Sequence, residues 1–196
     1  MPLVLDKSGK KFGKSEGNAL WLDKNKTSSY QLYQYLINTD DSLVIKYLKI
    51  FTFLSKEEIE KLEKSNQEEP EKRLAHQALA KEIITDLHGE EEYLHAKELS
   101  NVLFTEEFTN LTSKDIQEIF TNQEIIMIKS NNLVDLLLEL KAAKSKREAR
   151  EFISNGAIKI NGQKNTDLDY LLEAKDFLDT TYIIIHRGTK HYYIGK

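Results

Sequence analysis

The stretch SKREAREFISNGAIKING, residues 145–162, carries the clearest fold signals in the 196-residue chain. Ser145 and Glu148 have the spacing of a capping box, in which each side chain accepts a hydrogen bond from a backbone N–H at the start of a helix. Gly156 suits the left-handed position that follows a helix end, and Asn161-Gly162 is a strong signal for a hairpin turn. This stretch therefore predicts a short helix followed by a β-hairpin.

The residues on either side extend this pattern to a small module of helices and strands. Leucines recur at helical spacing within residues 133–143, which predicts a helix before the quoted stretch. Apolar segments at residues 182–185 and 192–194 flank Gly188-Thr189, which predicts a second hairpin. We therefore expect a small α+β module over residues 131–196.

Residues 29–130 predict an α-helical domain and a linker. Ser55 and Glu58 form another capping box, and a later apolar stripe recurs every three to five positions until Gly89 ends it. Residues 1–28 are polar and contain several glycines, which is typical of a loop. The predicted fold class is α+β multidomain, with an α-helical domain followed by the small α+β module.

The composition excludes several classes of protein. The chain has no cysteine, which excludes disulfide scaffolds and thiolate metal sites and fits a reducing cytoplasm. No run approaches the roughly 20 apolar residues that a membrane helix needs, and the N-terminus lacks the segments of a secretory signal. The five histidines form no metal-like cluster, so we expect no metal site.

Charge is unevenly distributed along the chain. Residues 1–143 hold 18 Lys and Arg against 25 Asp and Glu, whereas residues 144–196 hold 10 against 7. The net charge of −4 therefore hides a basic C-terminal part. A basic segment on an acidic body favours an acidic partner, with nucleic acid as the leading candidate. A chance imbalance is the alternative interpretation.

Lys146, Arg147 and Arg150 lie in the first two turns of the predicted helix. Exposed cations at a helix N-terminus oppose the macrodipole at a cost of roughly 0.3–1 kcal/mol each. We therefore interpret them as presented, together with the N-terminal amides, to a phosphate backbone. Lys159 on the following strand and Lys164 just past the turn extend this predicted RNA-binding surface. A solvated helix face with salt bridges to nearby glutamates is the alternative.

A second pair of lysines lies in KFGKS, residues 11–15. Gly13-Lys14-Ser15 matches the end of a P-loop, but three residues separate Gly9 from Gly13 where that motif has four, and its strand–helix context is missing. Two lysines beside a glycine can still wrap a polyphosphate, because the glycine lets backbone N–H groups approach while the ammonium groups neutralise charge. A solvated basic loop is the alternative.

Segments from both halves together resemble bacterial tyrosyl-tRNA synthetase, in order and over essentially the whole chain. In the first half these are the KFGKS loop, Trp21-Leu22-Asp23, residues 33–41 and residues 47–55. In the second half, residues 145–162 resemble the family's C-terminal RNA-binding domain, whose fold is shared with the fourth small-subunit ribosomal protein. The family's nucleotide-binding domain, with its His-x-Gly-His signature, has no counterpart in this sequence.

The resemblance implies roles that the pattern alone does not assign. In a full-length tyrosine–tRNA ligase, Lys11 and Lys14, with Ser15 as a loop partner, would bind the phosphates of magnesium-bound ATP. The two lysines would also stabilise the transition state of tyrosyl-adenylate formation. Asp40 and Asp41 would accept hydrogen bonds from a guanine edge of the anticodon, with helix capping as the alternative for at least one of them.

The resemblance also implies the partners of the chain. The C-terminal module would bind the anticodon stem and the long variable arm of tyrosine tRNA, mainly by backbone and shape recognition. The family's dimer contact lies in the nucleotide-binding domain, so we expect this chain to be monomeric and inactive in both reaction steps. The alternative functions are an RNA-binding module of another RNA-modifying or ribosome-associated protein, and a structural protein that interacts through acidic helices.

Overall fold

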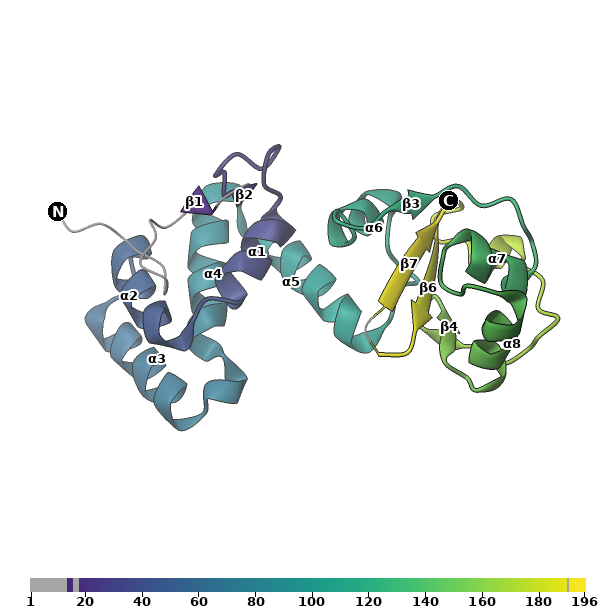
Figure 1. Cartoon of the computed structure of the whole chain (residues 1–196). Coiled ribbons are helices and arrows are strands. Elements are labelled where there is room, and N and C mark those ends of the chain that lie inside the picture. The colour runs from purple at the N-terminus through teal and green to yellow at the C-terminus, as the bar shows by residue number, and fades with distance from the viewer. Residues whose placement is uncertain (1–13, 16–17, 190) are drawn as a thin grey trace. The chain divides into compact units, whose positions relative to one another are not determined.

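The computed structural model divides the chain into two compact units, Met1–Ser100 and Asn101–Lys196 (Figure 1). The residues described are 14–15, 18–189 and 191–196, and side chains are described from residue 20 onward with the same gap at 190. Within these residues no helix is both long and apolar enough to cross a bilayer. Each unit has its own core and is described by itself.

The first unit is helical, as predicted. Its elements are the short antiparallel pair β1 (Lys14–Ser15) and β2 (Asn18–Ala19), then α1 (Ser29–Ile37), α2 (Asp41–Phe51), α3 (Lys56–Glu68), the 3-10 turn η1 (Pro70–Lys72) and α4 (Leu74–His88). Side-chain caps begin three of the helices, and the capping box of Ser55 and Glu58 is confirmed at α3. Gly89, with φ 98°, ends α4 as predicted. The helix α5 (Glu90–Thr105) continues into the second unit.

The second unit is a small five-stranded sheet with helices on it. Its elements are α6 (Ser113–Ile119), β3 (Ile125–Ile126), α7 (Leu133–Glu139), α8 (Lys146–Ser154), β4 (Ile158–Ile160), β5 (Gln163–Lys164), the 3-10 turn η2 (Ala174–Asp176), β6 (Ile183–Arg187) and β7 (His191–Gly195). The strand order is β3-β7-β6-β4-β5. β3 pairs with β7 in parallel, and the other pairs are antiparallel.

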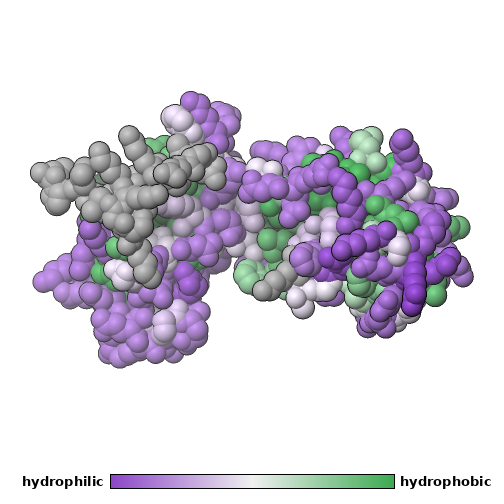
Figure 2. Space-filling view, viewed as in Figure 1, coloured by the Kyte–Doolittle hydropathy of each residue, from purple (hydrophilic) through white to green (hydrophobic). Residues whose placement is uncertain are grey.

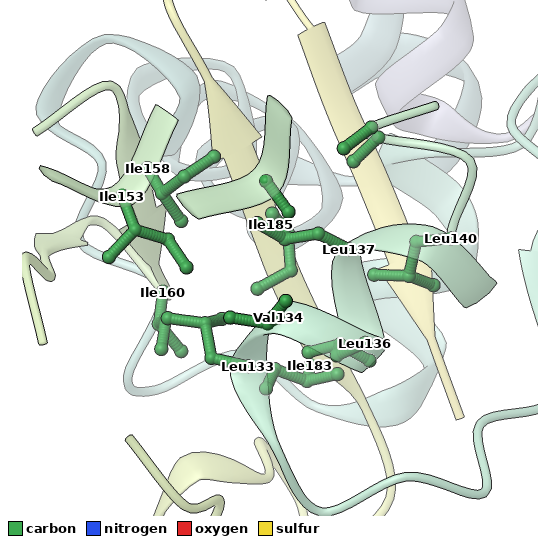
Figure 3. Close-up of a cluster of buried hydrophobic side chains, with 13 residues drawn as sticks. Leu133, Val134, Leu136, Leu137, Leu140, Ile153, Ile158, Ile160, Ile183 and Ile185 are labelled. Atoms are coloured by element: carbon green, nitrogen blue, oxygen red, sulfur yellow. The ribbon is translucent and has the colours of Figure 1, made fainter. Parts of the chain in front are cut away.

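One face of this sheet packs against α7 and α8. Figure 3 shows the leucines of α7 meeting isoleucines of β4 and β6. The fully buried members of this core include Leu133, Leu136, Leu137, Ile153, Ile158, Ile183 and Ile185. Burying each such side chain contributes about 1.5–3 kcal/mol. Because side chains alternate along a strand, Ile184, His186 and Lys159 point to the opposite face, where Phe108 and Phe120 pack against Tyr192.

Both predicted hairpins are confirmed. Asn161 and Gly162 have φ values of 48° and 86°, the positive pair that a tight two-residue turn requires. Gly162 has a second constraint, because a Cβ there would lie 2.0 Å from the carbonyl oxygen of Glu106. The β6–β7 turn contains Gly188 at φ 68°, and Gly156 takes the left-handed position after α8 at φ 66°.

Two boundaries differ from the sequence analysis. The helix expected over residues 133–143 ends at Glu139, because Lys141 adopts φ 58° and turns the chain away from the helix. The division between units follows Ser100, not residue 130. Residues 101–130 belong with the second unit because β3 pairs with β7. Since β7 lies far along the chain from β3, a local sequence pattern could not predict this pairing.

Candidate nucleic-acid interface

The first turn of α8 is held by two side chains. Ser145 Oγ accepts a hydrogen bond from the Glu148 backbone N–H at 3.2 Å, as the predicted capping box requires. The Glu148 carboxylate accepts from the backbone N–H of Lys144 at 2.6 Å. The capping box predicts that this carboxylate accepts from the Ser145 N–H, and the observed donor is the residue before it, so the second half of that capping box is wrong by one residue. The Glu148 carboxylate is therefore already used as a hydrogen-bond acceptor at the N-terminus of α8.

Three cations project from the solvent side of α8. Ala149 and Ile153 are fully buried against the sheet, and this fixes Lys146, Arg147 and Arg150 on the exposed side. Lys146 Nζ lies 2.7 Å from the Asp135 carboxylate of α7. Within the described part of the chain, Arg147 and Arg150 have no salt bridge, and neither pairs with Glu148 or Glu151. These two guanidinium groups are therefore available to an external anion.

Lys164 lies at the other end of the same helix. It is exposed on β5, and its side chain crosses Gly156, where a Cβ would come within 2.0 Å of Lys164 Cε. Glycine is favoured at this position by its positive φ, while the flexible end of the lysine could move aside for a Cβ. The end of the Lys164 side chain, including its ammonium group, lies over Gly156 just past the end of α8.

Lys159 differs from the other predicted cations in its surroundings. Its ammonium group forms an ion pair with the Glu106 carboxylate, whose other oxygen lies 2.8 Å from His186 Nδ1. Burial raises the pKa of Glu106, but the hydrogen bond and charge of Lys159, together with His186, outweigh it and hold the pKa below its ordinary value of 4.5. Lys159 faces the opposite side of the sheet from α8, so the structure separates it from Arg147 and Arg150.

Arg187 is a cation that the sequence analysis missed. Its guanidinium group lies 5.2 Å from the ring centre of Phe152 on α8 and 5.5 Å from that of Tyr193. It also donates a hydrogen bond to the carbonyl of Ala142, just after α7. The available signal was strand alternation, since Arg187 follows Ile183 and Ile185 on the face that packs against α7 and α8.

The two aspartates that were predicted to contact the anticodon, Asp40 and Asp41, both have partners in the structure. Asp40 caps α2, accepting from the backbone N–H of Ser42 at 3.0 Å and from its hydroxyl at 2.5 Å. Asp41 keeps 59% of its side chain exposed, and its carboxylate lies 3.2 Å from Nε2 of the fully buried His76. The same nitrogen lies 3.0 Å from the Thr39 carbonyl oxygen. The capping interpretation therefore holds for Asp40.

The predicted phosphate-binding loop is only partly within the described residues. Lys11 lies outside them, and Lys14 and Ser15 form β1, with their side chains likewise outside. β1 pairs with β2 through Lys14↔Ala19 and Ser15↔Asn18. No group of three potential metal ligands occurs among the side chains that the structure describes.

Comparison with known proteins covers nearly the whole chain. A family described as tRNA synthetases class I (W and Y) matches residues 1–105, and one described as Tyrosine--tRNA ligase SYY-like C-terminal domain matches residues 115–194. Tyrosine--tRNA ligase of Bacillus pumilus is 48% identical over 99% of this chain and 47% of its own length. The Staphylococcus carnosus enzyme is 46% identical over 100% and 47%.

Solved structures include similar proteins as well. A solution structure of a tyrosyl-tRNA synthetase C-terminal domain is 35% identical, covers 46% of this chain and 93% of its own, and has a TM-score of 0.39. The chain spans about half the length of the curated relatives that it matches.

Proposed function

We propose that this chain, which belongs to the class I tRNA synthetase family of the tryptophan and tyrosine enzymes, is the tRNA-binding portion of a tyrosine–tRNA ligase. The observation that carries the proposal is the pair Arg147 and Arg150, which are exposed on α8 and form no salt bridge with any residue that the structure describes. These arginines lie within the segment that matches the ligase C-terminal domain. Their position against the helix macrodipole is explained by an anionic partner.

Each unit is assigned a different part of tRNA recognition: the second unit contacts phosphates, and the first reads sequence. Arg147, Arg150 and Lys164 neutralise phosphates along the anticodon stem and the long variable arm, which gives affinity with little sequence readout. Sequence readout is assigned to Asp41, whose carboxylate can accept hydrogen bonds from a guanine edge. Asp40 is assigned to capping α2, and Lys159 to the ion pair with Glu106.

In the whole enzyme the chain would also contribute to catalysis. Lys11 and Lys14, with Ser15, would hold the phosphates of magnesium-bound ATP and stabilise the charge that develops as tyrosine attacks the α-phosphate. The product, tyrosyl-adenylate, then transfers tyrosine to the 3′ end of its tRNA. The cytoplasm is the proposed location, because tRNA charging takes place there and the chain has no cysteine.

No His-x-Gly-His signature occurs in these 196 residues, so the isolated chain is proposed to bind tRNA without catalysing either step. We also propose that it is a monomer, with dimerisation of the whole enzyme residing outside it. Light scattering should give 22.7 kDa, and a value twice as large would contradict this. Tyrosine-dependent ATP–pyrophosphate exchange should be absent, and detectable exchange would refute the proposed division of functions.

Filter binding of the purified chain tests the proposal directly. Tyrosine tRNA should be retained more strongly than a tRNA with a short variable arm, and affinity should fall steeply with salt. Equal retention of both tRNAs would favour a general RNA-binding module of another protein. No retention of either at low salt would favour a structural role for the acidic helices.

A further inference from the structure

A cavity of about 290 Å³ lies at the edge of the sheet in the second unit. Its lining residues come from the start of β7, from the loop that leads into β3, and from the residues just after α7. Its lining includes Gln123, Glu124, Lys141, His191, Tyr192 and Tyr193. The volume is close to the lower limit of about 300 Å³ for small-molecule sites. The proposed function assigns no role to this cavity.

The backbone of β7 is only partly paired where it lines the cavity. His191, Tyr193 and Gly195 pair with Arg187, Ile185 and Ile183 of β6. On the other edge, Lys196 exchanges hydrogen bonds with Ile126 and Ile128, and β3 begins opposite Ile194.

Backbone groups alternate between the two edges of a strand, so Tyr192 points to the same edge as Ile194 and Lys196. β3 does not reach it, and within the described residues its N–H and C=O have no backbone partner on that edge. A donor and an acceptor therefore lie side by side at the cavity.

Charged groups of both signs stand beside this backbone. Glu124 and Lys141 form an ion pair at 3.2 Å, and each keeps 71% of its side chain exposed. An exposed ion pair contributes little to stability, so either partner can exchange it for a ligand at low cost. Tyr193 adds an aromatic side chain, half-buried beside Arg187. Together these groups offer donors, acceptors and an aromatic surface around a small volume.

We propose that this cavity binds one unstacked nucleobase of the RNA that the chain holds. A base edge presents donors and acceptors side by side, which matches the backbone pair of Tyr192, and unstacked bases are commonly read by edge hydrogen bonds and aromatic contact. Glu124 would accept from an amino or imino group of the base, and Lys141 would then be free for a neighbouring phosphate. This inference rests on the proposed function.

An extended peptide is the competing occupant of a sheet edge. Strand addition needs several consecutive residues with unpaired backbone groups. Among the described residues, Tyr192 is the one position of this edge without a backbone partner, because β3 occupies the edge beyond it. The short edge and the charged walls favour a single planar ligand.

Variants at Glu124 test the proposal in the full chain. Glu124→Trp fills the cavity and Glu124→Gln removes its charge, and Glu107→Trp and Glu107→Gln are the matched controls at an exposed glutamate of the same unit. The probes are a short single-stranded RNA of mixed sequence and a blunt RNA duplex. Loss of one base contact should weaken single-strand binding about tenfold for Glu124→Trp, with duplex binding unchanged. The control variants should bind both RNAs normally.

A ¹⁵N-labelled chain gives a second readout, because the amide signal of Tyr192 should shift when the single-stranded RNA is added. Normal single-strand binding by Glu124→Trp, with no shift at Tyr192, would overturn the cavity proposal while leaving RNA binding intact. A shift with an extended peptide but not with RNA would identify a strand-binding edge and also overturn it. Failure of the unmodified chain to bind tyrosine tRNA as well as both probes would refute the proposed function, and this inference with it, whereas binding of the tRNA but not of the single-stranded RNA would overturn this inference alone.

Discussion

The starts of α2 and α8 place opposite charges at the same position of a helix. At α2, Asp40 caps the backbone and Asp41 follows it, so negative charge meets the positive end of the macrodipole. At α8, Ser145 caps the backbone, but Lys146 and Arg147 follow. The first arrangement stabilises its helix, whereas the second opposes the macrodipole, and at Arg147 no salt bridge among the described residues offsets that cost.

The difference shows how a charge used by the fold can be told from a charge presented to a partner. Asp40 bonds to Ser42 within its own unit, whereas Asp41 lies beside buried His76 but keeps 59% of its side chain exposed. Arg147 and Arg150 have no salt bridge among the described residues. An unfavourable charge without an internal partner is the better indicator of an external one.

Glu106→Ala should have the largest effect on stability, and it tests the assignment of Lys159 to the fold. The change leaves Lys159 and His186 without their carboxylate. Breaking a buried pair costs about 3–5 kcal/mol, and because Lys159 is about a third exposed we expect about 2 kcal/mol. Urea unfolding measures the loss.

The pH dependence of the same pair has a defined sign. The pKa of Glu106 is lowered by folding, so its stabilisation is complete above the ordinary value of 4.5 and is lost as the pH falls through the folded value. Glu106→Gln should remove this acid-dependent loss. An unchanged unfolding free energy in both variants would mean that Lys159 is free to bind phosphate.

His76→Ala should destabilise the first unit by about 2 kcal/mol, because it removes a fully buried side chain and its contacts to Thr39 and Asp41. Burial, followed by the charge of Arg73, lowers the pKa of His76. The buried ring is therefore neutral, and its stabilisation is complete above pH 6.5 and lost as the pH falls below that value. Thermal unfolding across this range should lose the pH dependence in His76→Ala but keep it in His191→Ala, which changes an exposed histidine.

Asp40→Ala should cost about 1 kcal/mol, the usual value of an N-cap. Asp40→Asn is the matched variant, because asparagine caps a helix equally well while removing the charge. Equal RNA selectivity in the Asn variant and the unmodified chain is expected if Asp40 only caps α2. Relaxed anticodon selectivity in Asp40→Asn, measured by competition with mutated tRNAs, would assign base readout to Asp40 in place of Asp41.

Arg147→Glu should have the smallest effect on stability and the opposite sign. A carboxylate in the first turn of α8 should raise the free energy of unfolding by about 0.3–1 kcal/mol, while tRNA binding falls. Arg150→Glu lies beyond the first turn and should change stability less. A loss of stability in Arg147→Glu would show that this arginine stabilises the fold, and would contradict the conclusion that its charge is unfavourable at the start of α8.

Local signals accounted for much of the fold. The Asn161-Gly162 turn, the caps at Ser55 and Ser145, and the glycine stops at residues 89 and 156 each depend on residues within a few positions. Such interactions are decided by backbone conformations that few residue types allow. The sequence therefore predicts these features, and with them the two hairpins and the helix that carries the basic residues.

Long-range pairing could not be predicted in the same way. The ion pair of Lys159 with Glu106 joins residues 53 positions apart, and β3 has only two residues and lies in a mixed segment. Neither leaves a periodic pattern. For this reason the sequence analysis assigned Lys159 to the RNA surface and placed the boundary at residue 130.

Measurement of tRNA affinity against salt for Arg147→Ala/Arg150→Ala tests the central claim most directly. Filter binding with tyrosine tRNA at several salt concentrations gives both the affinity and its salt slope. The account predicts weaker binding by the double variant and a salt slope shallower by about one unit for each lost phosphate contact. Unchanged affinity and slope, in a variant that unfolds like the unmodified chain, would contradict it and leave the basic side of α8 as a solvated surface.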